Sequence, residues 1–129
     1  MIIKASLTKK QLIDFKINGF ITIDRFLDLQ YLDDLKARIE LLFKGSFETG
    51  IEPDEWNWKK ERDPSDITRQ ICNAWKSDCL IKSLVCNPII GENVSKLMGW
   101  KGARLLQDNI LWKPTQGKAL NFHQDAAYD

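Results

Sequence analysis

Hydrophobic residues recur at helical spacing in two segments near the start of the chain. Thr8 precedes residues 9–18 as a helix cap, and Gly19 follows them at a position that suits the left-handed end of a helix. Asp28 precedes residues 29–44, where leucine, isoleucine and phenylalanine recur every three or four positions. The pattern predicts two packing helices, one at 9–18 and one at 29–44.

Two more segments in the second half also favour helix. Asn87 and Pro88 open an apolar, helically spaced stretch that ends at Gly99, because proline suits the first position of a helix. Residues 67–85 are predicted to form mostly helix or turn, and Trp75 is expected to contribute a large side chain to the core.

The spacing of apolar residues changes to that of strands in two places. Residues 20–23 are predicted to form a short strand, and residues 104–112 a longer one after Gly99. Alternation in the longer strand places Gln107 and Asn109 on one face, although buried amides need hydrogen-bond partners. These amides either face solvent or line a polar cavity.

Residues 45–66 break the helical pattern with glycine, proline and many charged residues. Trp56 and Trp58 lie two positions apart, so an extended backbone would place both rings on the same face. One interpretation is that the two rings anchor a long loop to the body of the protein. The other is that the loop forms a lid over a substrate pocket.

The length of the chain predicts a single domain spanning 1–129, and its formal net charge is +1. That balance gives no electrostatic reason to expect nucleic acid or an anionic membrane as a partner, and no apolar run is long enough to span a bilayer. Cys72, Cys79 and Cys86 have no zinc-type spacing, so we expect small buried side chains in a reducing cytoplasm.

Candidate chemistry lies at the end of the chain, in Asn121-Phe122-His123-Gln124-Asp125. On a strand, His123 and Asp125 point to the same face and can grip one metal ion. They would be two ligands of the triad of two histidines and one carboxylate found in non-heme Fe(II) oxygenases. A lone His-x-Asp also arises by chance, so the context decides.

The context resembles the phytanoyl-CoA dioxygenase family of Fe(II)- and 2-oxoglutarate-dependent oxygenases. The resemblance consists of a strand-like segment at 104–112, then Lys113-Pro114, a glycine-containing loop and the His-Gln-Asp segment. It extends upstream to Asn18-Gly19-Phe20, to Asn87-Pro88 and to Leu97-Met98-Gly99. It covers nearly the whole chain in order and spacing rather than in identity.

The resemblance implies an α+β fold in which N-terminal helices pack on the first strands of a double-stranded β-helix, a jelly-roll barrel. It implies that His123 and Asp125 bind Fe(II), and that Gln107, Asn109 and Arg69 approach 2-oxoglutarate. Tyr128 would border the substrate pocket. The implied reaction uses O2 to hydroxylate a small organic molecule. An aspartate at 125 favours hydroxylation over halogenation, because related halogenases have a small residue there.

The resemblance also shows what this sequence lacks. Family members are about twice as long, and their second metal-binding histidine and 2-oxoglutarate-binding arginine lie downstream of His-x-Asp. His123 is the only histidine here. We therefore expect a truncated N-terminal portion that is inactive alone and binds Fe(II) weakly, with a second chain or a C-terminal half completing the barrel. The alternatives are a non-catalytic α+β interaction module with an accidental His-x-Asp and a cupin-like metal protein.

Overall fold

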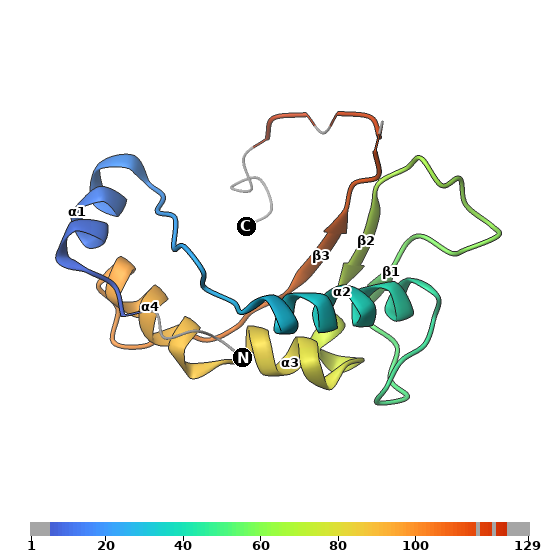
Figure 1. The fold of residues 1–129 in the computed structure, drawn as a ribbon, viewed down its shortest axis with the longest axis horizontal. Coiled ribbons are helices and arrows are strands. Elements are labelled where there is room, and N and C mark those ends of the chain that lie inside the picture. The colour runs from blue at the N-terminus through green and yellow to red at the C-terminus, as the bar shows by residue number, and fades with distance from the viewer. Residues whose placement is uncertain (1–5, 116, 120, 124–129) are drawn as a thin grey trace.

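The computed structural model describes residues 6–115, 117–119 and 121–123, and it shows an α+β arrangement (Figure 1). The helices are α1 (Lys9–Asn18), α2 (Leu29–Phe43), α3 (Cys79–Val85) and α4 (Pro88–Met98), with a short 3-10 helix η1 at Ala74–Lys76. The strands β1 (Glu55–Trp56), β2 (Arg69–Cys72) and β3 (Asn109–Trp112) form one antiparallel sheet in the order β1-β2-β3. The described part of the sheet is open, so a barrel is not part of what the structure shows.

Local capping signals account for where the helices begin and end. Thr8 accepts a hydrogen bond from the Gln11 backbone nitrogen at 3.2 Å, and the Gln11 side chain accepts one from the Thr8 nitrogen at 2.9 Å. Asp28 caps α2 by accepting from its backbone at 2.7 Å, and Asn87 caps α4 at 2.9 Å. Gly19 takes the left-handed conformation with a φ of 79°. The helices predicted at 9–18, 29–44 and 88–98 are therefore confirmed, to within a residue at their ends.

The strands differ more from the sequence-based expectation. Residues 20–23 form no strand, and the Thr22 carbonyl accepts only a long bond of 3.5 Å from the Gln11 side chain. β2 lies inside 67–85, where helix or turn was predicted, although η1 and α3 follow it there. β2 is the central strand and pairs with β3 far along the chain, so its stability comes from that partner rather than from its own four residues.

One face of the sheet packs against α2. Arg69 lies opposite Trp112 and Ile71 opposite Ile110, so alternation places all four side chains on the same face. Phe43, at the end of α2, packs edge-on against Trp112 with ring centroids 6.3 Å apart. The buried core contains Leu35, Leu42, Phe43, Trp58, Ile71, Ala74 and Ile81.

The segment between α2 and β2, which includes β1, is anchored by its two tryptophans. Trp58 is 6 % exposed, and its indole nitrogen donates to the Pro64 carbonyl at 2.9 Å. Trp56 packs edge-on against Phe47 at 5.3 Å and lies so close to Gly45 that an added Cβ there would come within 2.7 Å of its ring. Both rings contact the core, as the anchoring interpretation predicts.

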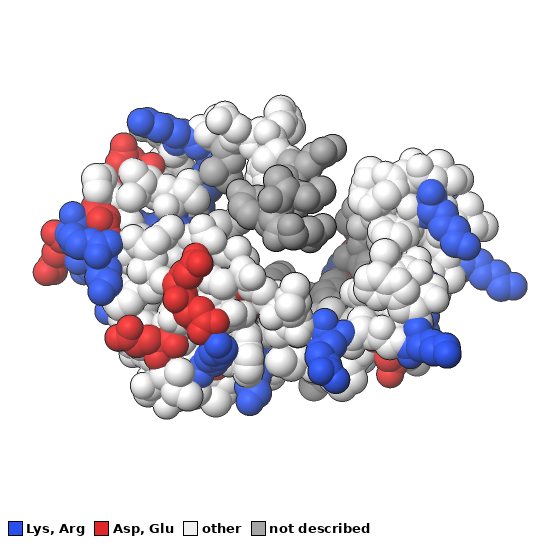
Figure 2. Space-filling view, turned by 180° about the vertical axis from the view of Figure 1, so that it is seen from behind, with Lys and Arg blue, Asp and Glu red and all other residues white. Residues whose placement is uncertain are grey.

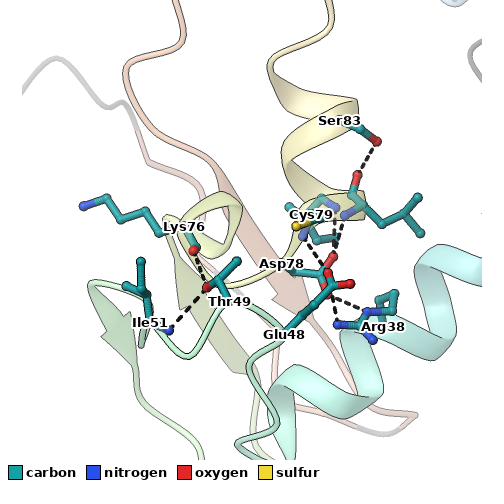
Figure 3. A network of polar contacts seen from close by, with 10 residues as sticks. Arg38, Glu48, Thr49, Ile51, Lys76, Asp78, Cys79 and Ser83 are labelled. Carbon is teal, nitrogen blue, oxygen red and sulfur yellow. Dashed lines mark hydrogen bonds and ion pairs between the residues drawn. The ribbon is translucent and has the colours of Figure 1, made fainter.

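A polar network around the buried Asp78 joins α2, the following loop and α3 (Figure 3). Asp78 is fully buried, caps α3 by accepting from two of its backbone nitrogens at 2.9 and 3.0 Å, and pairs with Arg38 of α2 at 2.5 Å. Glu48 lies 3.5 Å from Arg38 and accepts from the Cys79 nitrogen at 2.9 Å. The Thr49 hydroxyl donates to a carbonyl of η1 at 2.7 Å. The network fixes α2, the following loop and α3 together, with a further bond to η1.

The three cysteines are free thiols in different surroundings. Cys72 on β2 is buried, and that burial raises the pKa of its thiol. Cys79 and Cys86 are exposed, so the expectation of three buried side chains is wrong for these two. Each lies at an end of the short helix α3, where the side chain is not covered by the core. The negative charge of Glu48 raises the pKa of the Cys79 thiol.

The described surface is mixed in charge. Figure 2 shows acidic and basic side chains spread over the face seen from behind. Within the described residues, none of the helices is both long and apolar enough to cross a membrane.

Candidate functional site

His123 is the one member of the predicted metal pair that the structure describes. Its side chain is exposed, and its Nδ1 lies 3.0 Å from the carbonyl oxygen of Asn121. A carbonyl only accepts, so in the neutral imidazole Nδ1 carries the proton and Nε2 carries the lone pair that binds metals. Residues 121–123 form no strand. Asp125 and Tyr128 lie outside the described residues, so their predicted orientation remains a prediction.

The donor types at this site suit Fe(II), because imidazole nitrogen and carboxylate oxygen are the ligands of non-heme iron centres. The Asn121 carbonyl supports His123 in the way that outer hydrogen bonds orient metal-binding histidines. No cluster of three or more His, Cys, Asp or Glu side chains able to hold a metal occurs in the described ranges. By donor type alone, an imidazole and a carboxylate match two of the three protein ligands of a non-heme iron centre.

The two amides predicted to approach 2-oxoglutarate lie on the surface. Asn109 opens β3 opposite Cys72, and alternation places it with Leu111 on the face that points away from α2. Asn109 is exposed, and Leu111 is 58 % exposed. Gln107, two residues earlier, is also exposed. Both amides are therefore exposed in the part of the chain that the structure describes, and their role towards 2-oxoglutarate stays a prediction.

Arg69 lies on the opposite face of the sheet from Asn109. It pairs in register with Trp112, and its guanidinium carbon lies 3.7 Å from the centre of the Trp58 ring, on the side covered by α2. The sheet therefore separates Arg69 from Asn109, and the structure does not bring together all three residues that the resemblance assigns to 2-oxoglutarate.

Sequence reasoning missed a buried carboxylate immediately before β3. Asp108 is 8 % exposed, and its Oδ1 accepts from the Trp75 nitrogen at 3.1 Å while its Oδ2 is buried without a hydrogen-bond partner. Burial raises the pKa of this carboxyl. Its backbone carbonyl accepts from the Asn73 nitrogen at 2.9 Å, which extends the β2–β3 pairing. The available signal was strand alternation, which places Asp108 on the same face as Ile110 and Trp112.

A wide concavity lies between α4 and the segment 99–106, with a volume of about 1110 Å³. Its walls include Trp75, Ile90, Val94 and Leu106. These side chains offer apolar contact. His123 and Asn109 are not among its lining residues.

Comparisons with models of known protein families, with curated proteins and with solved structures found no match to this chain.

Proposed function

We propose that this chain is the N-terminal part of an Fe(II)- and 2-oxoglutarate-dependent oxygenase that hydroxylates a small organic molecule. The observation that carries the proposal is the placement of Asn109. It lies on the face of the sheet that points away from α2, on the strand that leads into His123 and Asp125. In a completed jelly-roll barrel, that face would line the interior.

Each residue has a distinct role in this proposal. The imidazole of His123 and the carboxylate of Asp125 hold the iron, and the Asn121 carbonyl fixes the histidine tautomer through the 3.0 Å contact with Nδ1. The side-chain amides of Asn109 and Gln107 donate hydrogen bonds to a carboxylate of 2-oxoglutarate. The proposal assigns no role to Arg69, because it lies on the other face of the sheet from Asn109.

When bound, iron and 2-oxoglutarate supply an oxidation in which O2 gives one oxygen atom to succinate and one to the product hydroxyl, with release of CO2. The third protein ligand is a histidine in the family that the sequence resembles, and this sequence contains only His123. We therefore propose that another polypeptide segment, in the same protein or in a second chain, supplies that ligand.

Succinate release tests the proposal. The protein produced from its native gene should release succinate when given Fe(II), 2-oxoglutarate and O2. The Asp125→Ala variant of that protein should release none. Lys118→Ala is the matched control, because it changes an exposed residue in the same stretch. The isolated 129-residue chain, verified by mass, should show no turnover. Succinate release that survives Asp125→Ala would exclude the mechanism, and its absence from the wild-type preparation would favour a non-catalytic interaction module.

A further inference from the structure

A second pocket lies on the face of the sheet covered by α2, with a volume of about 400 Å³. Three aromatic rings form its walls, from Phe43 at the end of α2, Trp58 in the loop and Trp112 on β3. Arg69 of β2 also lines it. We call this cavity the Arg69 pocket. Its volume is within the range of about 300–1,000 Å³ that small-molecule sites occupy.

The aromatic rings hold the Arg69 guanidinium in place. Its central carbon lies 3.7 Å from the centroid of Trp58 and 6.0 Å from the centroids of Phe43 and Trp112. Trp58 is itself fixed by its hydrogen bond to the Pro64 carbonyl at 2.9 Å. Cation–π attraction at these distances explains where the guanidinium sits. That attraction does not satisfy the hydrogen-bond donors of the guanidinium.

Those donors have no acceptor in the protein as described. Arg69 Nε is buried without a hydrogen-bond partner, and within the described ranges neither a carboxylate nor a carbonyl bonds to the rest of the guanidinium. Buried polar groups are nearly always hydrogen-bonded. A guanidinium presents its donors as a planar fork that matches an oxyanion at two points. A guanidinium that is held against aromatic rings and lines a cavity is therefore suited to an anionic ligand.

The charges around the pocket narrow the class of anion. Lys44 and Lys60 line the cavity together with three acidic residues, Glu40, Glu61 and Asp63. Apart from Arg69, the lining carries two positive and three negative charges, so it disfavours the second negative charge of a dianion such as phosphate. We propose that the Arg69 pocket binds a small molecule with one carboxylate on an apolar body. The carboxylate takes the guanidinium fork, and the apolar body packs against the aromatic walls.

This site is independent of the proposed iron site. Arg69 and Trp112 lie on the α2 side of the sheet, whereas Asn109 lies on the other side. Binding in the Arg69 pocket therefore requires neither metal nor 2-oxoglutarate, and its failure would leave the oxygenase proposal unaffected.

Nuclear magnetic resonance of the ¹⁵N-labelled wild-type chain tests the proposal directly, with benzoate as the probe and inorganic phosphate as the comparison. Benzoate should shift the Arg69 Nε–H and Trp58 indole N–H resonances in a saturable way, and phosphate should shift them far less. No saturable benzoate shift would overturn the proposal. Equal shifts with phosphate would overturn the assignment to an apolar carboxylate.

Variants separate two-point recognition from simple charge attraction. Arg69→Lys keeps the positive charge but loses the planar fork, so benzoate affinity should fall about tenfold or more. Arg104→Lys is the matched control, because Arg104 is exposed and does not line this pocket. The Trp58 indole resonance reports whether each variant is folded. Unchanged affinity in folded Arg69→Lys would contradict recognition by the fork.

Discussion

Two arginines, Arg38 on α2 and Arg69 on β2, differ in what surrounds their charged groups. Arg38 pairs with the buried Asp78 at 2.5 Å and with Glu48 at 3.5 Å, and the bond to Asp78 raises the pKa of its guanidinium. Arg69 stacks on Trp58 at 3.7 Å and bonds to no described acceptor. An arginine whose donors are satisfied within the fold stabilises that fold. An arginine that is held by aromatic rings and bonds to no protein acceptor keeps its hydrogen-bond donors available for a ligand.

The largest expected effect concerns stability at Arg38. Arg38→Met would leave the Asp78 carboxylate buried without its charge partner, so the free energy of unfolding should fall by about 3–5 kcal/mol. The same substitution at Arg69 removes no ion pair and should cost about 1 kcal/mol, chiefly from lost ring contact. Urea denaturation of both variants measures the difference.

Lys36→Met is a further control for that pair of variants, because Lys36 forms an exposed ion pair with Asp33 that contributes less than about 1 kcal/mol. Equal losses for Arg38→Met and Arg69→Met would contradict the distinction between the two arginines.

The buried carboxyl of Asp108 should affect the free energy of unfolding less than Arg38 does, and its effect should depend on pH. Burial raises the pKa of its carboxyl above the usual 3.8, against the opposing bond from the Trp75 nitrogen. As pH rises from 3.8 through that raised pKa, the unfolded state loses its proton first, so Asp108 increasingly favours unfolding. In Asp108→Asn, the free energy of unfolding should therefore fall less steeply as pH rises through this window.

Asp54→Asn provides a control of opposite sign for the pH series. The bond from Lys76 lowers the pKa of the Asp54 carboxyl, so its stabilising effect is lost as pH falls below 3.8. Denaturation curves collected across the acidic range distinguish the two variants. A steeper decline in Asp108→Asn than in the wild type would contradict the account of Asp108.

The helices were predictable because their signals are local. Thr8, Asp28 and Asn87 each bond to a backbone nitrogen two or three positions ahead, and Gly19 and Gly99 adopt the left-handed conformation at helix ends. Such contacts depend on neighbouring residues alone, so the sequence suffices to place them.

The strands were less predictable because pairing is not local. β2 has four residues and depends on β3, which follows some way along the chain, whereas the apolar run at 20–23 pairs with no described strand. The Arg69 pocket was missed for the same reason. Trp58, Arg69 and Trp112 come from three separate segments. The sheet register pairs Arg69 with Trp112, and the loop that holds Trp58 places its ring against Arg69.

Metal binding tests the central claim about His123 and Asp125 most directly. Mn(II) takes the same kinds of donor as Fe(II) and is stable in air, and its electron paramagnetic resonance signal weakens on binding. In the presence of 2-oxoglutarate, the wild-type chain should bind Mn(II) weakly. His123→Ala and Asp125→Ala should abolish that binding, and Lys118→Ala should retain it. Undiminished binding in His123→Ala, or none in the wild type, would contradict the assignment of this site.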